Sequence, residues 1–135
     1  QRQMCIRDSL EVIHDYVFSR SKVVDVDPKH AASLPPITQR LVRKNPNTGA
    51  KSFYIGSHAK EIAGWDYDES RSLLDELLVQ TTVDEHIYTH KWQSGDLVIW
   101  DNRCILHRGT GYDADKYRRF MRQTRVAGLG PTLEE

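Results

Sequence analysis

The chain has 135 residues, with nineteen basic and nineteen acidic side chains and a formal net charge of zero. This length fits one domain on the usual prior of ~100–200 residues per domain, and the neutrality argues against a nucleic-acid-binding surface. No apolar run approaches the ~20 residues that span a bilayer, so we expect no membrane partner, and the lack of a disulfide framework among two cysteines favours the cytoplasm.

Residues 1–9, QRQMCIRDS, resemble the translated adaptor sequence that contaminates assembled environmental genes. They carry no signal-peptide pattern of charged start, apolar core and small-residue cleavage site. We therefore assign residues 1–9 to a non-native peptide and residues 10–135 to the C-terminal portion of a single domain.

The first half of the chain mixes helical and strand patterns. Apolar residues spaced by three and four predict a helix over 10–20, and residues 21–34 are interpreted as a loop. Strands are expected over 38–44 and 51–55, joined by a turn rich in Asn, Pro and Gly, which together predict a hairpin.

Two helices are then expected before the second half. A short one covers 58–63 and is ended by Gly64. The spacing of Asp66 and Glu69 predicts the start of a longer helix, whose leucine stripe continues to about Gln80.

The second half is typical of strands separated by turns. The strands are expected over 86–92, 96–100, 104–107 and 118–126. This order predicts a mainly β fold with helical insertions, either an antiparallel sheet or part of a β-sandwich or barrel.

His107 is the first candidate for chemistry because it ends an apolar strand and precedes a Gly-containing loop. Such a position lies at the rim of a sheet, where ligand groups often gather. A neutral imidazole is a good ligand for iron or zinc. Considered alone, a rim histidine is more often a structural group hydrogen-bonded to backbone.

The strand over 118–126 is the second candidate because it is rich in arginine. Alternation places Arg119, Met121, Gln123 and Arg125 on one face. An inward-facing arginine needs an anion, and its planar guanidinium matches a carboxylate with two hydrogen bonds. A solvated edge strand explains the same pattern equally well.

Other polar and aromatic residues favour structural roles. His86 and His90 share a strand face, but a metal pair lacks an obvious third ligand, so a polar sheet face is favoured. Asp101 is expected to anchor a turn, and Trp100 to pack in the core or at a rim. For His58, a pocket and an exposed position remain open.

Together these residues resemble a known family. The stretch GDLVIWDNRCILHRG, followed by RRFMRQTRVAG, resembles the C-terminal signature of the TauD/TfdA family, the taurine and 2,4-dichlorophenoxyacetate dioxygenases. LVRKNPNTGAKSFYIGSHAKEIAGW resembles the family's hairpin and the insert after it. The likeness covers roughly residues 35–128 and leans towards the dichlorophenoxyacetate branch.

The resemblance implies an iron(II)- and 2-oxoglutarate-dependent dioxygenase on a double-stranded β-helix, or jelly roll. In that family two histidines and one carboxylate hold the iron. His107 matches the distal histidine ligand, and Arg119 matches the residue that binds the C5 carboxylate of 2-oxoglutarate. The implied reaction consumes O₂, converts 2-oxoglutarate to succinate and CO₂, and hydroxylates a small organic substrate. We expect the intact protein to be a homo-oligomer.

Two departures from the family pattern shape the expectation. The chain contains no H-x-D pair, which supplies the other two ligands in the family, so by itself it should be an inactive fragment. Gln123 stands where the family often has a substrate-binding arginine, and Arg125 is the alternative contact for an anionic substrate.

Two non-enzymatic alternatives remain. One is a β-sandwich binding module that holds an anionic ligand on its arginine strand, and the other is an interaction domain with an exposed sheet edge. For an isolated fragment we expect poor expression or oligomerisation, because Leu97, Ile99 and Ile105 lose part of their cover.

Overall fold

The structure is a computed structural model that describes residues 8–127 and residue 133. The expectation of an adaptor-derived peptide falls mostly on residues 1–7, which lie outside the described residues. Within the described part, no helix has the length and apolar character needed to cross a membrane.

A three-stranded antiparallel sheet forms the centre of the body, in the order β2-β1-β5. Its strands are β1 (Glu11–His14), β2 (Ile37–Arg40) and β5 (Ala59–Ile62). Val12 on β1 pairs with Gln39 on one side and with Ile62 on the other. The sheet therefore joins segments that are far apart in the sequence.

Two predictions of helices, over 10–20 and 58–63, are wrong in the parts of these segments that form this sheet. The first half of the segment 10–20 is β1, and only α2 (Tyr16–Arg20) is helical, beginning after Asp15, whose carboxylate accepts a hydrogen bond from the Phe18 backbone N–H at 3.1 Å. The segment 58–63 contains β5 instead of a short helix. In both places, burial and pairing with neighbouring strands (β1 with β2 and β5, and β5 with β1) outweigh a weak local helical pattern.

The hairpin is confirmed as β3 (Val42–Lys44) paired with β4 (Lys51–Phe53). Its turn contains Gly49, with a positive φ of 72°, a conformation that costs glycine little. The expected strand over 38–44 is divided at Leu41, which is fully buried. A further helix, α3 (Pro28–Ala32), lies within the segment expected to be a loop, capped by Asp27.

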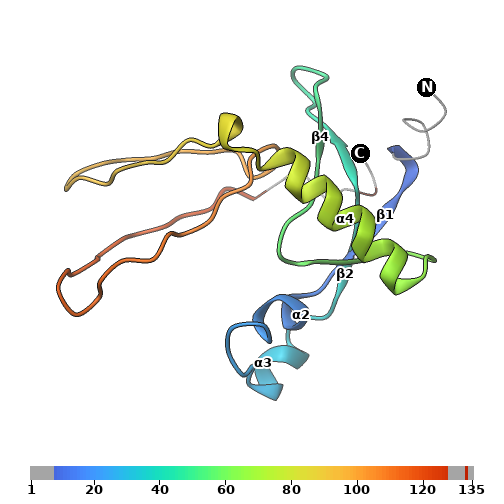
Figure 1. Cartoon of the computed structure of the whole chain (residues 1–135), viewed down its shortest axis with the longest axis horizontal. Helices are drawn as coiled ribbons and strands as arrows, with labels where there is room; N and C mark the ends of the chain where they lie inside the picture. Colours follow the sequence, from blue (N-terminus) through green and yellow to red (C-terminus); the bar gives the residue numbers. More distant parts are fainter. Residues whose placement is uncertain (1–7, 128–132, 134–135) are drawn as a thin grey trace.

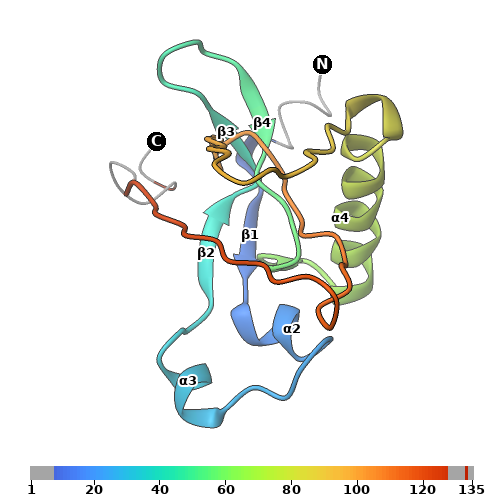
Figure 2. The same cartoon turned by 90° about the vertical axis from the view of Figure 1, so that its left-hand side faces the viewer.

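The long helix is confirmed as α4 (Tyr67–Thr81), and it covers one side of the body (Figures 1 and 2). The Asp66 carboxylate accepts hydrogen bonds from the backbone N–H groups of Asp68 at 2.8 Å and Glu69 at 3.2 Å, which satisfies donors that a helix start leaves open. Leu74 and Leu77 point into the core, which is completed by Val12, Leu41, Ile55, Ala59 and Ile62.

After the short 3₁₀ helix η1 (Asp84–His86), the chain forms two long excursions that project away from the body (Figure 1). We call residues 87–104 the first arm and residues 105–127 the second arm. Neither arm contains a regular strand in the described residues, so the strands expected in this half are not formed. The reason is physical, since a strand requires a hydrogen-bonded neighbour.

Candidate functional site

The two arms meet at a turn formed by residues 101–104. The Asp101 carboxylate accepts hydrogen bonds from the backbone N–H of Arg103 at 2.9 Å and from its guanidinium at 2.7 Å. The bonds from the Arg103 side chain and backbone lower the pKa of Asp101 to about 2. The expectation that Asp101 anchors a turn is confirmed.

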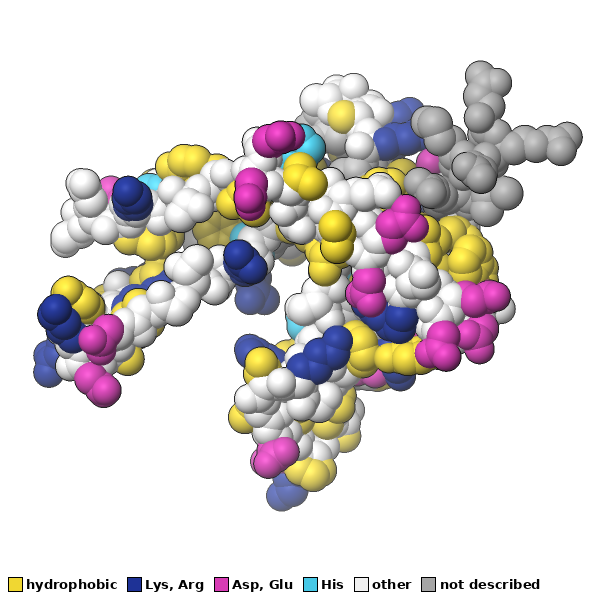
Figure 3. Space-filling view, in the orientation of Figure 1, with side chains coloured by type: hydrophobic (Ala, Val, Ile, Leu, Met, Phe, Trp, Pro, Cys, Tyr) yellow, Lys and Arg dark blue, Asp and Glu magenta, His cyan; other side chains and the backbone are white. Residues whose placement is uncertain are grey.

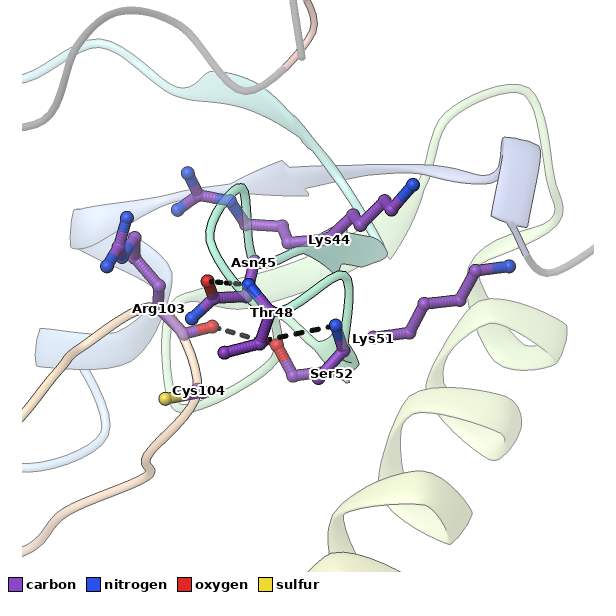
Figure 4. Close-up of a pocket in the computed structure, with 9 residues that line it drawn as sticks. Lys44, Asn45, Thr48, Lys51, Ser52, Arg103 and Cys104 are labelled. Carbon is purple, nitrogen blue, oxygen red and sulfur yellow. Dashed lines mark hydrogen bonds between the residues drawn. The ribbon is translucent and has the colours of Figure 1, made fainter.

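This turn is tied to the hairpin of the body. The Ser52 hydroxyl donates a hydrogen bond to the Arg103 carbonyl at 2.9 Å (Figure 4). A cavity of 240 Å³ lies between the hairpin and the turn, with Lys44, Lys51 and Arg103 among its lining. It is smaller than a typical ligand pocket of about 300–1,000 Å³, and none of the site residues expected from the sequence lines it.

His107 follows this turn in the second arm and is exposed. Its imidazole contacts the Trp100 ring, with 5.1 Å between the centroids and an angle of 53° between the planes. The Trp100 indole N–H donates a hydrogen bond to the Asn102 side-chain oxygen at 2.8 Å. The turn therefore orients Trp100, the aromatic neighbour of His107. The only sequence signal for this role of Asn102 is the WDNR motif at residues 100–103.

Arg119 lies in the second arm beyond its tip. Its guanidinium carbon is 5.5 Å from the centroid of the Tyr112 ring, and its Nε lies 2.8 Å from the sulfur of Met121. The contact with Met121 agrees with the predicted alternation of faces. Gln123 and Arg125 are exposed.

The described residues do not bring His107 and the arginine-rich segment 118–126 together in one pocket. Within the described residues, no hydrogen bond or ring contact joins His107 to Arg119, Gln123 or Arg125. The arginine pattern left an inward-facing position and a solvated edge strand as alternatives, and the side chain of Arg119 is exposed. The barrel wall that would enclose it is not formed by the described part of the chain.

Two histidines, His14 and His58, lie close together where β1, α2 and β5 meet. The Ser19 hydroxyl lies 2.6 Å from Nδ1 of His58 and donates to the Tyr16 carbonyl at 2.9 Å. Because the hydroxyl hydrogen is directed to the Tyr16 carbonyl, Nδ1 of His58 is placed to donate to the Ser19 oxygen. His58 is therefore held against α2 at an exposed position, which is one of the two alternatives that the sequence left open.

His14 in the same region is half-buried, and its ring lies 5.3 Å from that of Tyr54. Burial, with a smaller contribution from His58, lowers the pKa of His14 to about 4. Its buried Nε2 has no hydrogen-bond partner in the described structure. No sequence pattern signalled this residue.

His86 and His90 do not form a metal pair. His86 ends η1, whereas Nε2 of His90 lies 3.0 Å from Asp96 and its Nδ1 lies 3.1 Å from the Tyr88 hydroxyl. The Gln93 backbone N–H and then His90 lower the pKa of Asp96. These contacts close the tip of the first arm, which is a structural role.

The described residues do not by themselves fit a three-ligand iron site. Nowhere in the described part do three His, Cys, Asp or Glu side chains gather closely enough to hold a metal ion. His107 supplies one imidazole, a suitable iron ligand, but a facial triad needs two more groups.

Comparison with known proteins finds one matching family model and several relatives, among them dioxygenases. The model of the family described as taurine catabolism dioxygenase TauD, TfdA family matches residues 2–124. The chain is 41% identical over 119 residues to the alpha-ketoglutarate-dependent 2,4-dichlorophenoxyacetate dioxygenase of Cupriavidus pinatubonensis, covering 87% of this chain and 42% of that protein. It is 44% identical over 88 residues to the (S)-phenoxypropionate/alpha-ketoglutarate-dioxygenase of Sphingobium herbicidovorans, covering 65% of this chain and 30% of that protein.

A solved structure matches nearly the whole chain. The crystal structure of AAD-2 in complex with Mn(II) and N-oxalylglycine superposes with a TM-score of 0.87 and 36% sequence identity, covering 98% of this chain and 53% of AAD-2. Such coverage must include both arms. The chain therefore spans about half of AAD-2 and less than half of the curated relatives it matches.

Proposed function

Because the chain belongs to the TauD/TfdA dioxygenase family, we propose that it is part of an Fe(II)- and 2-oxoglutarate-dependent dioxygenase that hydroxylates a small organic molecule. The observation that carries this proposal is the 41% identity over 119 residues to a dioxygenase of that type. It favours an enzyme over a non-catalytic β-sandwich binding module.

The proposed fold is the C-terminal part of a double-stranded β-helix. The superposition of 98% of the chain on AAD-2 supports it, although the described residues form only two small sheets. On this view the arms are strands of the barrel that lack their neighbours. The assignment of residues 10–135 to one portion of a single dioxygenase domain is part of the same proposal.

We assign His107 to the iron and Arg119 to 2-oxoglutarate. The exposed imidazole of His107, held beside Trp100, is the ligand that this chain would contribute. The guanidinium of Arg119 can pair with a carboxylate through two charge-assisted hydrogen bonds, as the C5 carboxylate of 2-oxoglutarate requires. When bound, iron and 2-oxoglutarate would supply the oxidising chemistry, and the protein would supply ligation and orientation.

Gln123 and Arg125 are the proposed substrate contacts. A glutamine amide offers neutral hydrogen bonds, so an anionic group on the substrate would be met by Arg125 instead. The names of the matched relatives describe activity on 2,4-dichlorophenoxyacetate and (S)-phenoxypropionate, and a small organic acid is consistent with that role for Arg125.

The test is oxygen consumption by the intact protein with Fe(II), measured with and without 2-oxoglutarate. We expect consumption only when 2-oxoglutarate is present. Arg119→Ala should raise the apparent KM for 2-oxoglutarate about 10- to 100-fold, since it removes hydrogen bonds to a charged group.

Arg118→Ala is the matched control, because alternation places Arg118 on the opposite face of the arm. It should leave the apparent KM unchanged. Equal KM values for the two variants would remove Arg119 as the 2-oxoglutarate anchor, and oxygen consumption independent of 2-oxoglutarate would reject the activity itself.

A further inference from the structure

The imidazole of His107 has few neighbours that could fix its orientation. Its side chain is exposed, and both arms stand clear of the packed body over most of their length (Figure 3). Among the described residues, neither nitrogen of the ring makes a hydrogen bond or an ion pair. The last torsion of a histidine side chain is broad and roughly two-fold, so a neighbour has to select the direction of the ring.

That neighbour is Trp100. The two ring centroids are 5.1 Å apart, with 53° between the planes, which lies within the separation of about 4.5–7 Å that is typical of packed aromatic rings. A histidine that binds a metal usually has its other ring N–H held by a carboxylate, a carbonyl or water. His107 lacks such a bond within the described residues, so the contact with Trp100 is what limits the rotation of its ring.

Trp100 is held in turn by one hydrogen bond. Its ring is half-buried, and its indole N–H donates to the side-chain oxygen of Asn102 at 2.8 Å. The indole has a single donor, so rotation of the ring away from Asn102 would break this bond. Asn102 therefore determines which way the indole faces His107.

Asn102 lies in a turn that is closed from two sides. Inside the turn, the Asp101 carboxylate binds the backbone N–H of Arg103 at 2.9 Å and its guanidinium at 2.7 Å. From outside, the Ser52 hydroxyl ties the Arg103 carbonyl to β4 at 2.9 Å. A continuous series of contacts thus runs from the hairpin of the body to the imidazole of His107.

We propose that Trp100 and Asn102 are positioning residues for His107, because the indole, oriented by Asn102, holds the imidazole in one direction for metal binding. This inference rests on the proposed function, since it takes His107 as a metal ligand. The effect passes through the imidazole, so it falls on the affinity for the metal. It does not fall on 2-oxoglutarate, which is assigned to Arg119.

The first measurement is NMR of this full chain without metal. The Trp100 ring should shift the resonances of the His107 ring protons and give nuclear Overhauser effects to them. Asn102→Leu removes the acceptor at similar volume and should abolish these effects, whereas Asn102→Asp keeps an oxygen acceptor and should retain them. Effects that persist in Asn102→Leu would show that Asn102 does not orient the indole and would overturn the proposal.

The second measurement is the Kd of the intact protein for Mn(II), by electron paramagnetic resonance of the free ion. Asn102→Leu and Trp100→Phe should each weaken binding about tenfold, since loss of a group that orients a metal ligand typically costs 10- to 100-fold. The apparent KM for 2-oxoglutarate at saturating Fe(II) should not change. The two substitutions together should cost no more than either alone, because both remove the same hydrogen bond.

Trp92→Phe is the matched control. The Trp92 ring contacts that of His90 at 4.6 Å at the tip of the first arm, so the same substitution is made beside a histidine that is not the proposed ligand. It should leave the Kd for Mn(II) unchanged. The helical circular dichroism of α4 checks that each variant keeps the fold of the body.

An Mn(II) affinity that Asn102→Leu and Trp100→Phe leave at the wild-type value would overturn the proposal. Additive losses in the double variant, or a loss that Asn102→Asp shares, would also overturn it. The proposed activity fails by a different result, namely wild-type protein that forms no succinate from 2-oxoglutarate. Wild-type protein that forms succinate while Asn102→Leu binds Mn(II) normally would reject the positioning role alone.

Discussion

At the residue scale, two side chains have lowered pKa values for opposite reasons: the charged form is stabilised in Asp101 and destabilised in His14. Asp101 is partly exposed, and its charge is stabilised by the Arg103 guanidinium in a tight turn. His14 is half-buried in the sheet, and its charged form is destabilised by burial. The first keeps a turn closed beside His107, and for the second we predict that acid destabilises the body.

The free energy of unfolding should fall as the pH drops from about 6.5 to about 4. The pKa of His14 is 6.5 ordinarily and about 4 in the folded chain, so the unfolded state binds more protons in this window. Stability then rises with pH, by at most about 1.4 kcal/mol per pH unit for one proton. Urea denaturation across the window measures the slope.

His14→Phe should make that slope shallower, since it keeps an aromatic ring beside Tyr54 and removes the titrating group. His30→Phe, on the exposed surface of α3, is the control and should keep the wild-type slope. A slope that His14→Phe leaves unchanged would assign the acid sensitivity to other groups.

Single residues were predicted well where a motif or a local turn determines them. Asp101 was expected to anchor its turn because aspartate bonds readily to nearby backbone, and it does. The contact between Trp100 and His107 was not predicted in detail, since it depends on how the turn directs two rings. The histidine cluster of His14 and His58 depends on pairing between distant strands, which no local pattern contains.

At the scale of elements, local signals succeeded for α4 and for the β3-β4 hairpin. The helix has a capping aspartate and a leucine stripe, and the hairpin has a turn rich in Asn and Gly. They failed for β1 and β5, whose strand character comes from pairing with each other. They also failed for the arms, where sequence alternation predicts strands but the described residues offer these segments no hydrogen-bonded neighbouring strand.

One buried hydroxyl contributes to the contact between α4 and β5, beside the bonds of Arg71 to the Ala59 and Lys60 carbonyls. Ser70 is fully buried, and its Oγ accepts a hydrogen bond from the Ile62 backbone N–H at 3.0 Å. Ser70→Ala leaves that N–H buried without a partner, so the free energy of unfolding should fall by about 1–3 kcal/mol. Urea unfolding followed by circular dichroism measures the change.

Ser72→Ala provides the comparison, because Ser72 lies on the exposed side of the same helix. Its effect should stay within about 0.5 kcal/mol. If the two alanine variants unfold at the same urea concentration, the hydroxyl of Ser70 does not link the helix to the sheet.

At the scale of the whole molecule, a small packed body carries two extended arms (Figure 1). The body holds the core of the sheet and α4, while His107 and Arg119 lie in the second arm. The proposed site residues are thus outside the part of the chain that packs on itself. The chain spans less than half the length of the curated relatives it matches and about half of AAD-2.

The central claim is that this chain contributes His107 to a 2-oxoglutarate-dependent dioxygenase. The most direct test is the rate of succinate formation from 2-oxoglutarate by the intact protein with Fe(II), for His107→Ala beside His86→Ala. We predict that the His107 variant loses succinate formation while the His86 variant keeps a rate near wild type. Equal rates for the two variants would contradict it.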